Sequence, residues 1–62
     1  MQESKHEYKG LAYSMEEIGG EFRFHIPYRN FVSEWYTAAN SYGDPEKAAY
    51  QAAKWLIDVY VG

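Results

Sequence analysis

The first half of the chain alternates apolar and polar residues in a way that predicts two strands. Within residues 8–15 an apolar side chain occupies every second position from Leu11, which is the period of two expected of a strand. The segment 21–26 alternates aromatic or aliphatic side chains with Glu, Arg and His, as in an antiparallel strand with one buried face. Between these segments, Gly19-Gly20 offers the positive φ that a tight turn needs.

Residues 31–42 are compatible with two structures. Aromatic and β-branched residues favour a third strand over Phe31–Ala38, and a third strand also relieves the marginal stability of an isolated hairpin. Polar residues recur there at helical spacing as well, with Asn30 as a candidate N-cap. We expect the strand, and a helix over Phe31–Ser41 is the alternative.

A C-terminal helix is predicted over about residues 45–60. Asp44 can cap its first amides, Pro45 suits the first helical position and Glu46 complements the positive end of the helix dipole. At about 100° per residue, one side of this helix forms the predicted core face. Its members are Ala48, Ala49, Ala52, Trp55, Leu56 and Val59.

Three further apolar side chains, Tyr50, Ile57 and Val61, fall on the far side of this helix. A helix face that contacts only water does not need three large apolar side chains. We therefore expect a contact surface or homodimer interface there. On this interpretation, Ile57→Asp abolishes association and leaves the fold intact.

Together these elements predict an α+β fold in a single domain spanning residues 1–62. The expected architecture is a three-stranded antiparallel meander packed by one C-terminal helix (βββα), and the alternative is a β-hairpin plus two helices. Residues 1–5 are expected to be disordered, because a polar terminus has nothing to bury.

Composition limits the partner chemistry. The chain has no cysteine, which excludes disulfides and thiolate metal sites. Aromatic residues make up 19% of the chain and can supply a hydrophobic core. The net charge of -3 argues against a dedicated nucleic-acid-binding protein, which concentrates positive charge. No apolar run approaches the length of a membrane span, so we expect a cytoplasmic protein that makes no membrane contact.

The two histidines are the candidates for catalysis or metal binding. His25 together with His6 and Glu7 forms a conceivable acid/base pair, but catalysis needs convergent geometry in a pocket. The histidines also lack the spacing of zinc ligands, and Gly19-Gly20 lies between strands instead of opening a helix as a phosphate loop does. We therefore expect no enzymatic activity, no metal and no cofactor.

The outer face of the sheet suggests a nucleic-acid-binding module as the alternative function. Arg23, His25 and Arg29 lie among tyrosines, and basic residues interleaved with aromatics can contact phosphates and bases. This interpretation predicts binding that weakens steeply with salt.

The run Tyr42–Ala49, which follows the strand at 21–26, resembles the sheet-to-helix junction of two DNA-binding groups. These are the arm-binding domains of phage-type integrases and the plant ethylene-response DNA-binding domains, each with three strands followed by one helix. In both, an aromatic residue precedes an acidic-capped helix that opens with small residues. Some small antitoxin domains share this junction. Those DNA-binding sheets use several Arg and Lys, where this chain has Glu21 and Glu34.

The hypothesis that the sequence favours is a non-enzymatic protein-binding domain: a small acidic inhibitor or adaptor, with a phage-encoded accessory or anti-defence protein as one version. Tyr and Trp give large contact areas with few rotatable bonds. The predicted partner is another protein. In one version of this hypothesis the partner binds nucleic acid, and clustered carboxylates of this chain occupy the positions that phosphates would take. The residues predicted to contact it are Tyr50, Ile57 and Val61 on the helix and Glu16, Glu17 and Glu21 around the first turn.

Overall fold

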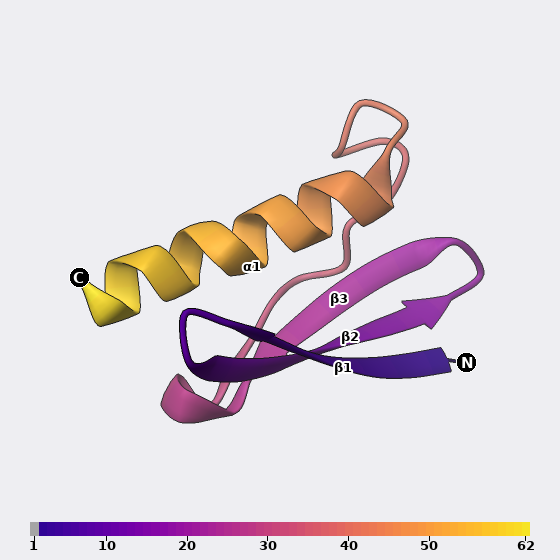
Figure 1. The fold of residues 1–62 in the computed structure, drawn as a ribbon. Coiled ribbons are helices and arrows are strands. Elements are labelled where there is room, and N and C mark those ends of the chain that lie inside the picture. Colours follow the sequence, from indigo (N-terminus) through magenta and orange to yellow (C-terminus); the bar gives the residue numbers. More distant parts are fainter. Residues whose placement is uncertain (1) are drawn as a thin grey trace.

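A computed structural model describes residues 2–62 and places an antiparallel sheet against a C-terminal helix (Figure 1). The elements are β1 (Gln2–Tyr8), β2 (Leu11–Ile18), β3 (Glu21–Ile26), the short 3-10 helix η1 (Pro27–Arg29), β4 (Phe31–Val32) and α1 (Pro45–Val61). Strand order in the sheet is β1-β2-β3-β4. The predicted α+β class is confirmed. The sheet has four strands where three were expected, because an additional strand precedes them.

That additional strand, β1, corrects the prediction that the N-terminal segment is disordered. Its residues pair with β2 along their whole length, from Gln2 opposite Glu17 to Tyr8 opposite Leu11. Lys9 and Gly10, with φ of 53° and 82°, form the primed two-residue turn whose twist suits a hairpin. As a mostly exposed edge strand, β1 carries little apolar alternation for the sequence to reveal. Met1 lies outside the described residues.

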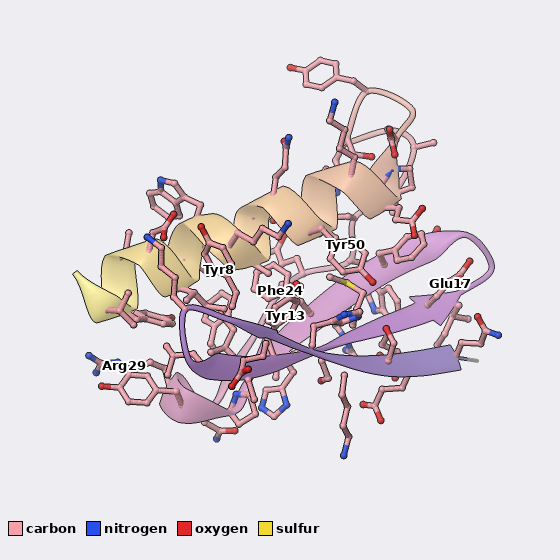
Figure 2. The ribbon with its side chains drawn as sticks, viewed as in Figure 1. Tyr8, Tyr13, Glu17, Phe24, Arg29 and Tyr50 are labelled. Atoms are coloured by element: carbon pink, nitrogen blue, oxygen red, sulfur yellow. The ribbon has the colours of Figure 1, made fainter. Side chains whose placement is uncertain are left out.

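The hairpin of β2 and β3 agrees with its prediction in β3 and in the turn, but β2 spans Leu11–Ile18 where the strand was expected within residues 8–15. Gly19 and Gly20 adopt φ of 58° and 83° at the turn, a conformation that costs glycine little. The register sets Met15 opposite Phe24, so that both side chains point to the helix-covered face of the sheet. Figure 2 shows Phe24 in the layer between the sheet and α1.

The strand predicted over Phe31–Ala38 forms only in part. Phe31–Val32 pairs with β3, and after an irregular segment Tyr36 bridges back to Phe22. At the break, Ser33 bonds Phe24 twice: its N–H donates to the Phe24 carbonyl and its Oγ accepts from the Phe24 N–H, each at 2.9 Å. This arrangement is a β-bulge, since the register shifts by one residue between Val32 and Tyr36. The alternative helix over Phe31–Ser41 is wrong, because this segment holds strand pairing followed by turns.

Helix α1 begins and ends as the sequence indicated. The carboxylate of Asp44 accepts a hydrogen bond from the Lys47 N–H at 3.1 Å, and Pro45 occupies the first turn. At the other end, the Gly62 N–H donates to the Asp58 carbonyl at 3.0 Å. The helix lies over β2 and β3, on one face of the sheet (Figure 1).

The predicted core face of α1 is confirmed at Ala49, and Ala52 and Leu56 pack against the core in part, but it is wrong at Trp55 and Val59. The residues with no exposed surface are Ala49, Ala53 and Ile57, spaced four residues apart, whereas Trp55 and Val59 are 65% and 56% exposed. At about 100° per residue, apolar side chains occupy roughly two thirds of this helix's circumference. Periodicity alone therefore leaves open which half of that sector the sheet covers.

Candidate binding surface

Helix α1 presents an apolar stripe along the border of its covered face, which is exposed at Trp55 and Val59. We call it the outer stripe and define it as Ala48, Ala52, Trp55 and Val59, which follow one another at helical spacing along one side. The two alanines are half-buried, and Trp55 and Val59 are the two most exposed apolar side chains of the helix. The sequence assigned these four residues to the core. The width of the apolar sector was the signal that a second, uncovered face existed.

The loop before α1 adds an aromatic side chain beside this stripe. Tyr42 is fully exposed and has a φ of 56°, an uncommon conformation for a residue with a side chain. An open hollow of about 610 Å³ lies between the loop and the helix. Its lining residues are Asn40, Ser41, Tyr42, Asp44, Lys47, Ala48, Gln51 and Ala52.

Hydrogen bonds within the loop hold this hollow in shape. The Asn40 side chain accepts from the Thr37 N–H at 2.8 Å and donates to the Trp35 carbonyl at 3.0 Å. The Gly43 N–H donates to the Ala38 carbonyl at 3.0 Å, and the buried Ser41 hydroxyl donates to the Thr37 carbonyl. The loop is thus preorganised, which lowers the entropy that a partner must overcome on binding.

A second hollow, of about 300 Å³, lies between Phe31, the segment that follows β4, and Leu56 of α1. Phe31, Trp35, Tyr36 and Leu56 provide its apolar walls, and Asn40 lines both hollows. No outer-stripe residue lines this second hollow, and Asn40 is the residue it shares with the first one.

The structure divides the three helix residues predicted to form the interface. Ile57 is completely buried in the core, so its assignment to an outer contact surface is wrong. Tyr50 is half-buried, and its hydroxyl lies 3.1 Å from Nε2 of His6 on β1. Val61, at the end of the helix, is 48% exposed. The physical reason is that the buried face of the helix is rotated from the predicted one toward Ala53 and Ile57, although Ala49 belongs to both.

The three glutamates predicted around the first turn do not form one cluster. Glu16 and Glu17 are neighbours in β2 and point to opposite faces of the sheet, as alternation requires. Glu16 accepts hydrogen bonds from Arg23 at 3.0 and 2.5 Å on the open face, and Glu21 is exposed at the start of β3.

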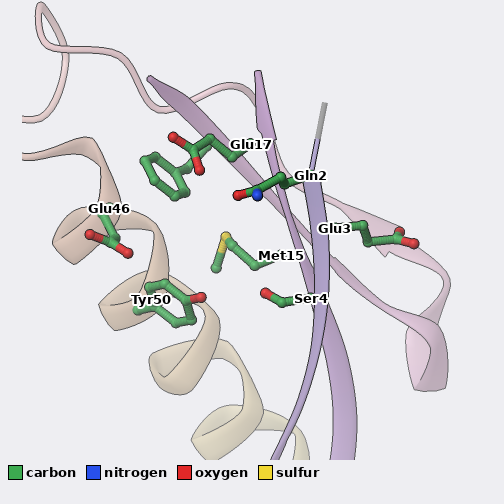
Figure 3. A pocket seen from close by; sticks show the side chains of 8 residues that line it. Gln2, Glu3, Ser4, Met15, Glu17, Glu46 and Tyr50 are labelled. Carbon is green, nitrogen blue, oxygen red and sulfur yellow. The ribbon is translucent and has the colours of Figure 1, made fainter. Parts of the chain in front are cut away.

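Glu17 instead lines a cleft between the sheet and the first turns of α1 (Figure 3). The cleft has a volume of about 370 Å³ and is lined by Gln2, Glu3, Ser4, Met15, Glu17, Phe22, Glu46 and Tyr50. Glu17 from β2 and Glu46 from α1 supply carboxylates on its two sides. Within residues 2–62, no three side chains of His, Asp or Glu gather as a metal-binding group.

The two histidines lie on opposite faces of the sheet. His6 stacks on Tyr13, with ring centroids 5.3 Å apart, and its Nε2 lies 2.7 Å from the Ser4 hydroxyl. Burial raises the pKa of the Tyr13 hydroxyl, and the charge of Tyr50 when ionised raises this pKa further. His25 lies on the open face, with Nε2 3.4 Å from Oδ1 of Asn30. The two imidazoles therefore cannot act on one substrate group.

The basic residues of the nucleic-acid alternative are likewise separated. Arg23 is paired with Glu16 and stacks over Trp35, with its guanidinium 4.6 Å from the ring centroid. Arg29 lies between Tyr28 and Tyr60, 5.2 and 5.4 Å from the two ring centroids. Tyr60 belongs to α1, so Arg29 reaches the helix end while Arg23 remains on the open face of the sheet. These positions give little support to a continuous phosphate-binding surface.

Comparison with protein-family models, with curated proteins and with solved structures finds no match to this chain. In the part of the chain that the structure describes, no helix combines the length and the apolarity needed to cross a bilayer.

Proposed function

We propose that this chain is a non-enzymatic protein-binding domain that docks on a larger protein through the outer stripe and Tyr42. The observation that carries the proposal is the exposure of Trp55, a large apolar side chain that is 65% exposed on a helix whose other face is fully buried. Small inhibitors and adaptors act by docking of this kind, and this is the role proposed here.

The spacing and size of the stripe residues suit a helix that lies against an apolar groove. Residues at i, i+4, i+7 and i+11 form the contact line of an amphipathic helix in such a groove. The small side chains of Ala48 and Ala52 permit close approach, and Trp55 supplies the bulky anchor typical of interface hot spots.

The proposed partner presents an apolar face bordered by uncharged polar groups. Neutral side chains, Asn40, Ser41 and Gln51, lie beside the stripe, and the two charged lining residues, Asp44 and Lys47, have opposite signs. Recognition is then dominated by burial of apolar surface, and affinity should depend only weakly on salt.

A paired-variant experiment tests the proposal. Trp55→Ser combined with Val59→Ser removes the exposed apolar surface, and Glu46→Ala combined with Lys54→Ala, away from the outer stripe, is the matched control on the same helix. Proteins captured from the source organism by the wild type are identified by mass spectrometry, and the interaction is then reconstituted with purified partner and measured by calorimetry. We expect at least about tenfold weaker binding of the serine variant and unchanged binding of the control.

Tryptophan fluorescence reports the contact directly. In a Trp35→Phe background, Trp55 is the remaining tryptophan, and its emission should shift to shorter wavelength when the partner covers it. Equal affinity of the serine variant and the wild type, or an unshifted Trp55 emission in the complex, would show that the outer stripe is not the docking surface.

A further inference from the structure

Strand β1 forms one edge of the sheet, and its outer side carries no partner strand among the described residues (Figure 1). An edge strand of seven residues presents a row of backbone donors and acceptors to which another strand can pair. This edge lies apart from the outer stripe of α1, so an interaction here goes beyond the proposed function and is independent of it.

The hairpin geometry identifies which backbone groups of β1 are free. In the two-residue turn, Tyr8 and Leu11 close the hairpin and form a hydrogen-bonded pair. Hydrogen-bonded and non-hydrogen-bonded pairs alternate along an antiparallel ladder. The N–H and C=O groups of Glu7, Lys5 and Glu3 therefore point away from β2, toward the open edge.

The same three residues carry charges of alternating sign. Glu3, Lys5 and Glu7 are exposed, project from the open face of the sheet, and take part in no ion pair within the described residues. Lysines alone on an edge strand discourage pairing, whereas a regular alternation of sign can match an antiparallel copy of itself.

We infer that β1 pairs antiparallel with β1 of a second copy of this chain, in a register centred on His6. Lys5 then lies opposite Glu7 of the second copy, and Glu7 lies opposite Lys5. Both residues have outward-pointing backbone groups, so each such pair exchanges two hydrogen bonds. The two sheets join into one continuous sheet around a two-fold axis, which closes the assembly at a dimer.

Charge disfavours the register centred on Lys5 and leaves the one centred on Ser4 as the alternative that the experiment must separate. Centring the pairing on Lys5 sets lysine opposite lysine and Glu3 opposite Glu7, which is repulsive. Centring it on Ser4 leaves only the Glu3 and Lys5 pairs. The His6-centred register has two opposite-charge pairs as well, Lys5 with Glu7 in each direction, and the Glu7→Lys variant distinguishes it from the Ser4-centred register.

Two opposite charge reversals test this arrangement. Lys5→Glu makes the edge uniformly acidic, and Glu7→Lys sets lysines at 5 and 7. Each variant alone opposes like charges in the His6-centred register, so light scattering over a concentration series should show self-association at least about tenfold weaker than that of the wild type. Mixed in equal amounts, the two variants should form a heterodimer, because every opposed pair is then of opposite charge.

Matched controls carry the same charge changes away from the edge. Glu21→Lys on β3 and Lys47→Glu on α1 should dimerise like the wild type, and circular dichroism should show that all variants are folded. In the wild type, the amides of Lys5 and Glu7 should become protected from hydrogen exchange as the protein concentration rises.

Three results would overturn the inference. The first is a wild type that stays monomeric over the concentration series. The second is a Glu7→Lys variant that still dimerises, as the Ser4-centred register would allow. The third is a mixture of the two variants that remains monomeric although each is folded.

Discussion

The Tyr50 hydroxyl of α1 lies 3.1 Å from Nε2 of His6 on β1, although 44 residues separate the two in sequence. The two rings meet edge to face, with centroids 5.2 Å apart, and both approach Tyr13 of β2. This contact ties the edge strand to the helix, and Tyr50 and Tyr13 lie in the layer between the sheet and α1 (Figure 2). A polar strand with little apolar surface is thereby held in the fold.

Tyr50→Phe should loosen this attachment without removing the ring. The substitution deletes the Tyr50 hydroxyl, which shares Nε2 of His6 with the Ser4 hydroxyl at 2.7 Å, so the free energy of unfolding should fall by at most about 1 kcal/mol. Urea unfolding measures this loss, and hydrogen exchange of the β1 amides should accelerate more than that of the β3 amides. Tyr42→Phe, at an exposed position, is the control. An unchanged unfolding midpoint and unchanged β1 exchange would show that the bond contributes nothing.

Ile57→Ala should lower the free energy of unfolding by about 2–5 kcal/mol, because it leaves a cavity in the fully buried layer between α1 and the sheet. Val59→Ala, two residues further on the uncovered side, should change it by less than about 0.5 kcal/mol. Denaturant unfolding of the two variants tests the corrected orientation of the helix. Equal effects at the two positions would contradict it.

Ser33→Ala should destabilise the bulge between β3 and β4. The Ser33 hydroxyl is the acceptor for the Phe24 N–H, so its removal leaves that donor unpaired. This should lower the free energy of unfolding by about 1–3 kcal/mol. Ser14→Ala, on the open face of β2, is the comparison at an ordinary strand position. The Phe24 amide should lose exchange protection in the Ser33 variant only; retained protection would refute the role given to the hydroxyl.

Alkaline pH should destabilise the protein through Tyr13. Burial raises the pKa of Tyr13 above its ordinary value of 10.0, so the unfolded chain releases this proton at lower pH than the folded one. The associated stability is complete below pH 10.0 and is lost as the pH rises through the pKa of the folded state. Urea unfolding at neutral and alkaline pH measures this loss.

Tyr13→Phe should reduce that alkaline loss, and Tyr42→Phe should leave it unchanged. Part of the loss should persist in the Tyr13 variant, because the hydrogen bond with Asp58 raises the pKa of Lys9 and acts in the same direction. The same pH dependence in the Tyr13 variant as in the wild type would show that this hydroxyl is not the responsible group.

Structural features that are specified by residues adjacent in the sequence could be predicted from the sequence. Gly19-Gly20 determines its turn through backbone conformation, and Asp44-Pro45 determines the start of α1 through capping. Strand β1 could not be found in this way, because an edge strand buries only His6 and Tyr8 in part and shows no apolar alternation. Its structure depends on pairing with β2.

At the candidate site, too, the sequence specifies some features and tertiary packing decides others. The sequence by itself determined that α1 has more apolar surface than one contact face needs, since apolar residues extend around roughly two thirds of its circumference. Only the tertiary structure decided that Ile57 faces the sheet and Trp55 faces outward. The reason is that helical periodicity defines the width of an apolar sector, whereas packing against Met15, Phe24 and the rest of the sheet selects which part of it is buried.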